Sequence, residues 1–208
     1  MPYWENMNIR KLLPGVIIAI ICTAMIVVSR PITASREYVK GIESRRTEID
    51  YYMKQDPESP IARDQRAGFI GLNYYPVDSE YRVSGTIRHF DGDEIIEVPL
   101  TSGTYERYIR YGEVELNDHT NLLEVWKPLS GTADNRLFVA FTDGTSGDTT
   151  YGGGRYLNLF LEDDDTMVID FNLAYNPYCV YDYSYACPLP PLENRLSIDV
   201  LAGEKNYP

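Results

Sequence analysis

The residues best suited to chemistry lie in the last third of the chain, between Phe141 and the C-terminus, where polar side chains stand among aromatic ones. Carboxylates, amides and a guanidinium in such surroundings could hold a small molecule between apolar walls. They could equally bond to nearby backbone and shape loops, and both interpretations stay open at the level of sequence. The candidate ligand-binding residues are Asp143, Thr145, Tyr151, Arg155, Asp170, Asn172, Tyr175, Asn176, Glu193 and Asn194.

Three glycines at 152–154 come directly before Arg155. A phosphate-binding loop is not indicated, because the Lys-Ser/Thr ending of such loops is missing. We expect the glycines to permit close backbone approach while Arg155 projects its guanidinium toward Asp170, Glu193 or a ligand carboxylate. An internal pair with an acid is the default expectation, since a buried guanidinium needs a partner.

The segment from Asp143 to Asp148 reads DGTSGD and could hold a cation or present a nucleophile. A Gly-Asp turn between strands is the favoured interpretation. Ser146 is not in a Gly-x-Ser-x-Gly elbow, and no helical segment follows it, which excludes a standard hydrolase elbow. A hydrolase-type enzyme would therefore use Asp143 or Asp170 as acid, base or metal ligand, with Arg155 holding an anion.

Cys179 and Cys187 lie in a proline-rich stretch and are candidates for a disulfide. A bridge closing so short a loop would stabilise the fold by roughly 2–3 kcal/mol. Free thiols are the second possibility. A zinc site is the third and is disfavoured, because the chain has two histidines, His89 and His119, and no tight pair of ligands. We expect no metal and no cofactor.

An uncharged apolar run covers Leu12 to Val28 and follows Arg10 and Lys11. Its length is at the short end of what spans a bilayer as a helix. A cleaved signal peptide is the alternative, but no small-x-small pair follows the run promptly. The basic residues favour a cytoplasmic N-terminus. We therefore expect a cytoplasmic segment at 1–11, a single-pass membrane anchor at 12–29 and one extracytoplasmic domain at 30–208.

The chain of 208 residues carries a formal net charge of -12. Its length suits one domain with a sizeable core. An acidic surface repels phosphate backbones, so nucleic acid is excluded as a partner. The expected partners are the membrane, through the N-terminal helix, and a small-molecule ligand.

Helical spacing of apolar residues predicts one amphipathic helix at 35–55, which we expect to dock onto the domain. Beyond Pro60 the period changes to two, typical of half-buried strands. A change of phase at Gly112 indicates a bulge, and the two segments flanking 162–165 are expected to form a hairpin. The predicted strands are 81–88, 94–100, 105–116, 120–127, 136–141, 155–161, 166–172 and 196–202. About eight strands indicate a mainly β fold, a small antiparallel barrel or a sandwich, with the barrel preferred because it leaves no exposed edges.

Several long motifs after Phe141 are distinctive. They are TDGTSG at 142–147, TYG at 150–152, GRY at 154–156, DFN at 170–172, AYNPYC at 174–179, CPLPP at 187–191, ENRL at 193–196 and AGEK at 202–205. Through them the chain resembles the bacterial and archaeal family catalogued as domain of unknown function 1684. The resemblance covers roughly Ser35 to the C-terminus. It implies no established activity, substrate or fold.

These observations lead to three hypotheses of function. The first is a membrane-anchored extracytoplasmic domain that binds a small ligand in a polar and aromatic pocket. The second is a hydrolase-type enzyme that uses Asp143 or Asp170 with Arg155. The third is a structural or interaction module in which the same polar residues are satisfied by the chain's own backbone.

Overall fold

The computed structural model describes residues 36–116, 122–129, 136–160 and 166–207. The segments expected at 1–11 and 12–29, and His119, lie outside the described residues. Within the described part, no helix has both the length and the apolar character needed to cross a membrane. The chain divides into two compact units, Met1–Gly41 and Ile42–Pro208. Of the first unit the structure describes residues 36–41, which are helical and begin the helix of residues 36–55.

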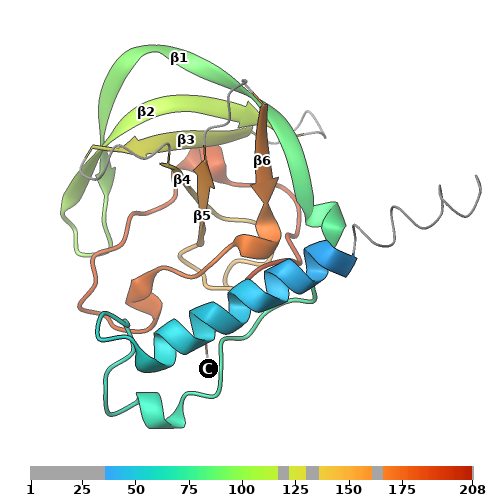
Figure 1. Ribbon diagram of the computed structural model, residues 1–208. Helices are drawn as coiled ribbons and strands as arrows, with labels where there is room; N and C mark the ends of the chain where they lie inside the picture. Colours follow the sequence, from blue (N-terminus) through green and yellow to red (C-terminus); the bar gives the residue numbers. More distant parts are fainter. Residues whose placement is uncertain (1–35, 117–121, 130–135, 161–165, 208) are drawn as a thin grey trace, which may run out of the picture. The chain divides into compact units, whose positions relative to one another are not determined.

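The second unit is built on one antiparallel sheet of six strands in the order β5-β4-β3-β2-β1-β6 (Figure 1). The strands are β1 (Arg82–Pro99), β2 (Tyr105–Glu115), β3 (Leu122–Pro128), β4 (Arg136–Phe141), β5 (Arg155–Phe160) and β6 (Thr166–Asp170). Two of the eight predicted strands, 81–88 and 94–100, are one long strand, because β1 continues through an irregularity between His89 and Glu94. The predicted strand at 196–202 is wrong. That segment bonds to the rest through scattered contacts rather than a ladder.

A bulge in β2 is confirmed beside Gly112. Arg110 pairs with Trp126 and Gly112 with Val125, so Tyr111 is an extra residue on β2. A Cβ at Gly112 would lie 2.7 Å from the carbonyl oxygen of Arg88, which leaves room for glycine alone. Bulges increase local twist and help a sheet to curl.

The sheet curls into a nearly closed barrel whose edge strands are β5 and β6 (Figure 1). The predicted hairpin between these strands is wrong, because β5 pairs with β4 and β6 with β1. All six strands contribute to the apolar interior, which includes Ile87, Val114, Val125, Val139, Leu157 and Ile169. The barrel expectation is therefore confirmed in its coarse form, with six strands and an unpaired seam.

The outer face of the sheet is also covered, although antiparallel sheets commonly leave one face to solvent. A second apolar cluster joins Tyr108, Trp126, Phe138 and Tyr156 of the sheet to the buried Cys179 and Cys187. The segment 174–191 thus packs over the outside of the barrel. Short 3-10 turns shape this and the other connections: η2 (Arg66–Gly68), η3 (Ser79–Tyr81), η4 (Phe171–Leu173), η5 (Tyr178–Val180) and η6 (Leu192–Asn194).

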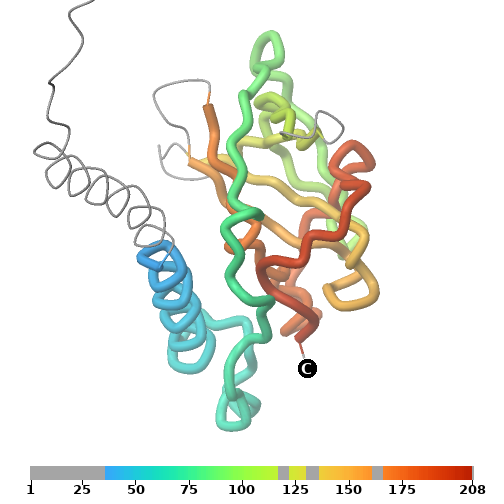
Figure 2. The backbone as a smooth tube through the Cα atoms, turned by 90° about the vertical axis from the view of Figure 1, so that its right-hand side faces the viewer, coloured from blue at the N-terminus to red at the C-terminus, as the bar shows by residue number. Residues whose placement is uncertain are grey.

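Within the second unit, the helix docks onto the domain as predicted. Met53 packs with Ile61, Phe69 and Tyr181 in a third apolar cluster. Polar bonds add to this packing, since Asp50 Oδ1 accepts from the Leu72 N–H at 2.9 Å. The segment around Leu72 runs between the helix and the C-terminal residues (Figure 2), and the Tyr75 N–H donates to the Gly203 carbonyl at 3.0 Å.

Candidate functional site

Arg155 and Asp143 form an ion pair inside the barrel wall. Nη2 of Arg155 lies 2.8 Å from Oδ2 of Asp143, and neither side chain has more than 1% of its surface exposed. Arg155 also donates to the carbonyls of Val200, Ala202 and Glu204, so its guanidinium holds the C-terminal segment against the strand. The expectation of an internal pair is confirmed. Its acid is Asp143, not Asp170 or Glu193.

The other carboxylate oxygen of Asp143 organises the turn that follows it. Oδ1 accepts from the backbone N–H and hydroxyl of Thr145, at 2.8 and 2.6 Å. The Thr145 hydroxyl also contacts that of Thr150 at 2.8 Å. The favoured turn interpretation of this segment is therefore confirmed, and Asp143 and Thr145 serve the fold.

Asn172 and Asn194 use their carboxamides as substitutes for backbone, because an amide side chain offers a donor and an acceptor as a peptide does. Asn172 accepts from the Asp78 N–H at 2.9 Å and donates to the Asp78 carbonyl at 2.7 Å. Asn194 accepts from the Glu124 N–H and donates to the carbonyls of Glu124 and Ala140. The register Trp126↔Phe138 would place Glu124 of β3 opposite Ala140 of β4. The Asn194 side chain bridges the two strands at this position.

Cys179 and Cys187 are both buried as free thiols in the structure, so the predicted disulfide is not formed in it. The Cys179 N–H donates to Sγ of Cys187 at 3.2 Å, which places the two residues side by side. Burial raises the pKa of the Cys187 thiol to about 12, and the neighbouring Cys179 thiol adds to this. Within the described part of the chain, no three His, Cys, Asp or Glu residues are grouped to hold a metal ion.

A cavity of about 810 Å³ lies on the outside of the barrel, against the two edge strands. It is bounded by β5 and β6, by the helix and by the covering segment 174–191. Seven tyrosines line it: Tyr52, Tyr108, Tyr156, Tyr175, Tyr178, Tyr181 and Tyr185. Three of the ten candidate residues, Asp170, Tyr175 and Asn176, also line this cavity, whereas Asp143, Thr145, Tyr151, Arg155, Asn172, Glu193 and Asn194 do not.

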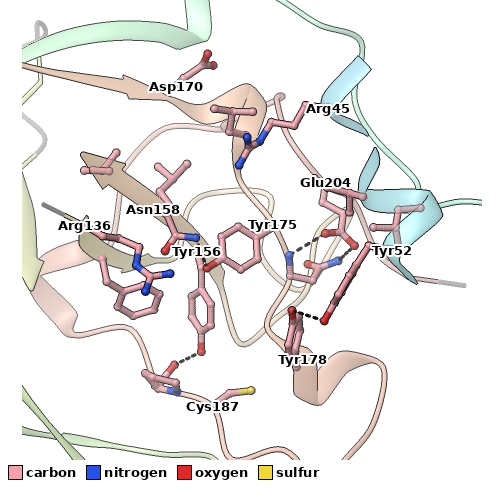
Figure 3. A pocket seen from close by; sticks show the side chains of 18 of the residues that line it. Arg45, Tyr52, Arg136, Tyr156, Asn158, Asp170, Tyr175, Tyr178, Cys187 and Glu204 are labelled. Carbon is pink, nitrogen blue, oxygen red and sulfur yellow. Dashed lines mark hydrogen bonds between the residues drawn. The ribbon is translucent and has the colours of Figure 1, made fainter. Parts of the chain in front are cut away.

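Most of the tyrosine hydroxyls in this wall donate to the protein's own oxygens. Tyr52 donates to the Glu58 carbonyl, Tyr108 to the Glu106 carboxylate and Tyr156 to the Pro188 carbonyl. Tyr52 and Tyr178 also contact each other through their hydroxyls at 3.4 Å (Figure 3). These bonds fix the rings in place, so the wall is preorganised and its rings present flat apolar surface.

Arg136, Asn158 and Tyr175 form a polar group on one side of the cavity, which we call the Arg136 cluster (Figure 3). Nδ2 of Asn158 donates to the Tyr175 hydroxyl at 3.0 Å, so this hydroxyl accepts and keeps its own proton for donation. Burial raises the pKa of the Tyr175 hydroxyl to about 12, while the Asn158 bond and the Arg136 charge oppose the shift. The hydroxyl therefore remains protonated at neutral pH.

The edge of β5 adds backbone groups to this cluster. The N–H and carbonyl of Tyr156 both bond to Tyr175, at 2.9 and 3.1 Å. In an antiparallel ladder the direction of these groups alternates from residue to residue. Asn158 comes two residues after Tyr156, so its backbone N–H is directed to the same edge of β5. Tyr175 covers this edge at Tyr156 but not at Asn158.

Glu204 lines the opposite side of the cavity and is 1% exposed. Its carboxylate accepts from the Asn176 N–H at 2.9 Å, the Asn176 side chain at 2.8 Å and the Tyr181 hydroxyl. Burial raises the pKa of this carboxyl to about 7, although the bonds from Tyr181 and Asn176 and the charge of Arg155 oppose it. Asn176 thus ties the chain end to the cavity wall.

Asp170 caps η4, because its Oδ1 accepts from the Asn172 N–H at 3.0 Å. Its other oxygen lies 4.0 Å from Nε of Arg82, which also lines the cavity. Sequence reasoning missed Arg136 and Asn158. The alternation of side chains along a strand could have indicated them. Even-numbered residues of β4 and β5 share the outer face with Tyr156, because Phe138 pairs with Asn158.

The fold and cavity define a class of small β-barrel domain with a tyrosine-lined outer pocket. The chain belongs to the family described as protein of unknown function DUF1684, whose model matches residues 67–205. It is similar to the solution NMR structure of an uncharacterized protein from Haloarcula marismortui, with 33% identity and a TM-score of 0.65, over 83% of this chain and 96% of that one. No curated protein matches the chain.

Proposed function

We propose that the domain binds a small organic molecule in the tyrosine-lined cavity. The observation that carries this proposal is the cavity itself, about 810 Å³ in volume, whose lining includes nine aromatic side chains together with aliphatic and polar ones. Ligand sites of proteins have this size and this composition. The membrane anchor expected at 12–29 would make it a tethered binding domain, and that part of the proposal rests on the sequence alone.

The cavity supports binding more than the hydrolase hypothesis. That hypothesis uses Asp143 or Asp170 with Arg155, and Asp170, which lines the cavity, accepts from the Asn172 N–H as the cap of η4. Asp143 and Arg155 have every carboxylate oxygen and terminal nitrogen committed to the fold. Neither lines the cavity. A reacting group must meet its substrate within hydrogen-bond reach, and these two are buried in the barrel wall.

The test uses N-phenyl-1-naphthylamine, a neutral dye that fluoresces in apolar surroundings. Wild-type protein should bind it with a dissociation constant of about 10 µM or lower. Ala186 lines the cavity and is exposed, so Ala186→Trp should fill the space without disturbing the core and weaken binding at least about tenfold.

The matched control is Ala67→Trp, at an exposed position of η2 away from the cavity. It should bind the dye like wild type. The difference between the two tryptophan variants isolates the cavity from any general adsorption of the dye. If wild type fails to bind, or if Ala186→Trp binds as tightly as Ala67→Trp, the proposal is wrong.

A further inference from the structure

The cavity runs along the edge of β5 that faces away from β4. Every residue from Tyr156 to Phe160 lines it, which includes the inward-facing Leu157 and Leu159 as well as the outward-facing residues. Successive side chains of a strand point to opposite faces, so a space that touches both sets meets the strand at its edge. β5 is the last strand of the sheet on this side. The cavity therefore reaches backbone groups of β5 and not only its side chains.

Tyr175 shows how this edge pairs with a single residue. The Tyr175 N–H donates to the Tyr156 carbonyl at 3.1 Å, and the Tyr175 carbonyl accepts from the Tyr156 N–H at 2.9 Å. This is the hydrogen-bonded pair of an antiparallel ladder, made here by one residue outside the named strands. The chain leaves the edge on both sides of Tyr175, because residues 171–173 form η4 and the Asn176 N–H donates to Glu204.

Asn158 directs the same two backbone groups to this edge. Alternate residues of a ladder present their N–H and carbonyl on the same side, and Asn158 follows Tyr156 by two. Leu173 would be the next residue opposite, but it belongs to η4, and both Leu173 and Asn158 line the cavity. Within the part of the chain that the structure describes, no group bonds to the Asn158 backbone on this side. An edge donor and acceptor of this kind are a template for an added extended segment.

Resting on the proposed function, we infer that the ligand is a short extended peptide that pairs with the Asn158 backbone as Tyr175 pairs with Tyr156. The ligand N–H donates to the Asn158 carbonyl, and the carbonyl of the same ligand residue accepts from the Asn158 N–H. Directly opposite residues of an antiparallel pair carry their side chains on the same face. The ligand side chain therefore lies on the outer face, beside the rings of Tyr156 and Tyr175, whose centroids are 5.8 Å apart. An aromatic side chain suits this place.

The ligand side of the test is competition against bound N-phenyl-1-naphthylamine. Two compounds differ in one group: N-acetyl-3-(2-naphthyl)alanine amide, and its acetoxy analogue, in which an ester oxygen replaces the acetylated N–H. Wild type should release the dye at a concentration of the peptide compound about tenfold lower than of the ester, because the ester leaves the Asn158 carbonyl without a donor.

The protein side compares two variants of the same residue. Proline has no N–H and is tolerated on edge strands, so Asn158→Pro removes the edge donor. Asn158→Ala removes the same side chain and keeps the N–H, which makes it the matched control. With inhibition constants corrected for the dye affinity of each variant, Asn158→Pro should bind the peptide compound at least about fivefold more weakly than Asn158→Ala.

Hydrogen exchange of the Asn158 N–H in wild type, followed by NMR, gives a readout that needs no variant. Saturation with the peptide compound should slow this exchange at least about tenfold.

The inference is overturned if the ester competes as well as the peptide compound, if the proline variant binds as tightly as the alanine variant, or if exchange at Asn158 does not slow. Dye binding with any of these outcomes rejects the peptide ligand and leaves the cavity proposal standing. Failure of the dye to bind wild type rejects the cavity proposal first.

Discussion

Arg155 and Arg136 stand on the same pair of strands and have opposite fates. Arg155 begins β5 and pairs across to Phe141, while Arg136 begins β4 and pairs across to Phe160. Arg155 is an inward residue with 0% exposure, bonded to Asp143 and to three carbonyls. Arg136 is an outward residue, exposed at the cavity. Identical side chains therefore hold the fold together on one face and stand exposed at a cavity on the other.

The polar residues of the motif-rich region are conspicuous in the sequence for a structural reason. A barrel that lacks regular strands at its C-terminal end must satisfy the buried backbone of that segment with side chains. Arg155, Asn172 and Asn194 do so. The cavity is lined in part by residues that look ordinary in the sequence, such as Arg136 and Asn158.

The largest expected effect on stability comes from removing the Arg155 guanidinium. Arg155→Gln leaves the Asp143 carboxylate buried without a counter-charge and three carbonyls without their donor, so the free energy of unfolding should fall by about 3–5 kcal/mol. Urea denaturation followed by circular dichroism measures it. A loss below about 1 kcal/mol would mean that the pair does not clamp the C-terminal segment to the barrel.

Gly154, next to Arg155, tests how closely the chain is packed there. Its φ of +90° and the 2.4 Å approach of a Cβ to the Phe141 carbonyl oxygen both exclude a side chain. Gly154→Ala should cost about 3 kcal/mol, the sum of left-handed strain and overpacking. Gly92 shares the positive φ at +78° but has nothing within 4 Å, so Gly92→Ala should cost about 1 kcal/mol. Equal losses in the two variants would contradict the packing argument.

Glu204 contacts Arg155 through its backbone carbonyl and also lines the cavity. Titration of its carboxyl should make the free energy of unfolding depend on pH. The folded-state pKa is raised from 4.5 to about 7, so the folded protein holds this proton more tightly than the unfolded chain. The stabilisation is fully present below pH 4.5 and is lost as the pH rises through about 7, on the order of 3 kcal/mol in total. The measurement is the difference in unfolding free energy between wild type and Glu204→Gln across this range. A difference that does not change with pH would contradict the raised pKa.

The smallest effect on stability is expected at Arg136. Because the side chain is exposed, Arg136→Gln should change the free energy of unfolding by less than about 0.5 kcal/mol, in the same urea experiment that measures Arg155→Gln. A loss approaching that of Arg155→Gln would remove the contrast between the two arginines and make Arg136 a structural residue as well.

Much of the fold follows from local patterns. The helix, five of the six strands near their observed bounds, and the bulge beside Gly112 all follow from periodicity and glycine placement. The merging of two predicted strands into β1 does not, because the irregularity at His89 to Glu94 looks like a turn in sequence. The missing hairpin between β5 and β6 does not either, since the choice of partner depends on strands that are distant in the chain.

The candidate site was predicted less well, and the reason is physical. Asp170, Tyr175 and Asn176 do reach the cavity, but the other seven candidates were selected for polarity in an aromatic setting, which is also the composition of a buried hydrogen-bonded loop. Arg136 and Asn158 lie in plain strands. They line the cavity because the covering segment 174–191 packs over the outer face of the sheet and turns part of that face into a cavity wall.

The class of fold, the acidic character of the chain and the family follow from the sequence, because they depend on the two-residue period of strands, on composition and on the long motifs after Phe141. The register between β4 and β5, which places Arg155 and Arg136 on opposite faces, does not. Tertiary structure alone decided which face became saturated and which became a cavity. That outcome depends on which distant segments cover each face, and local sequence carries no record of such contacts.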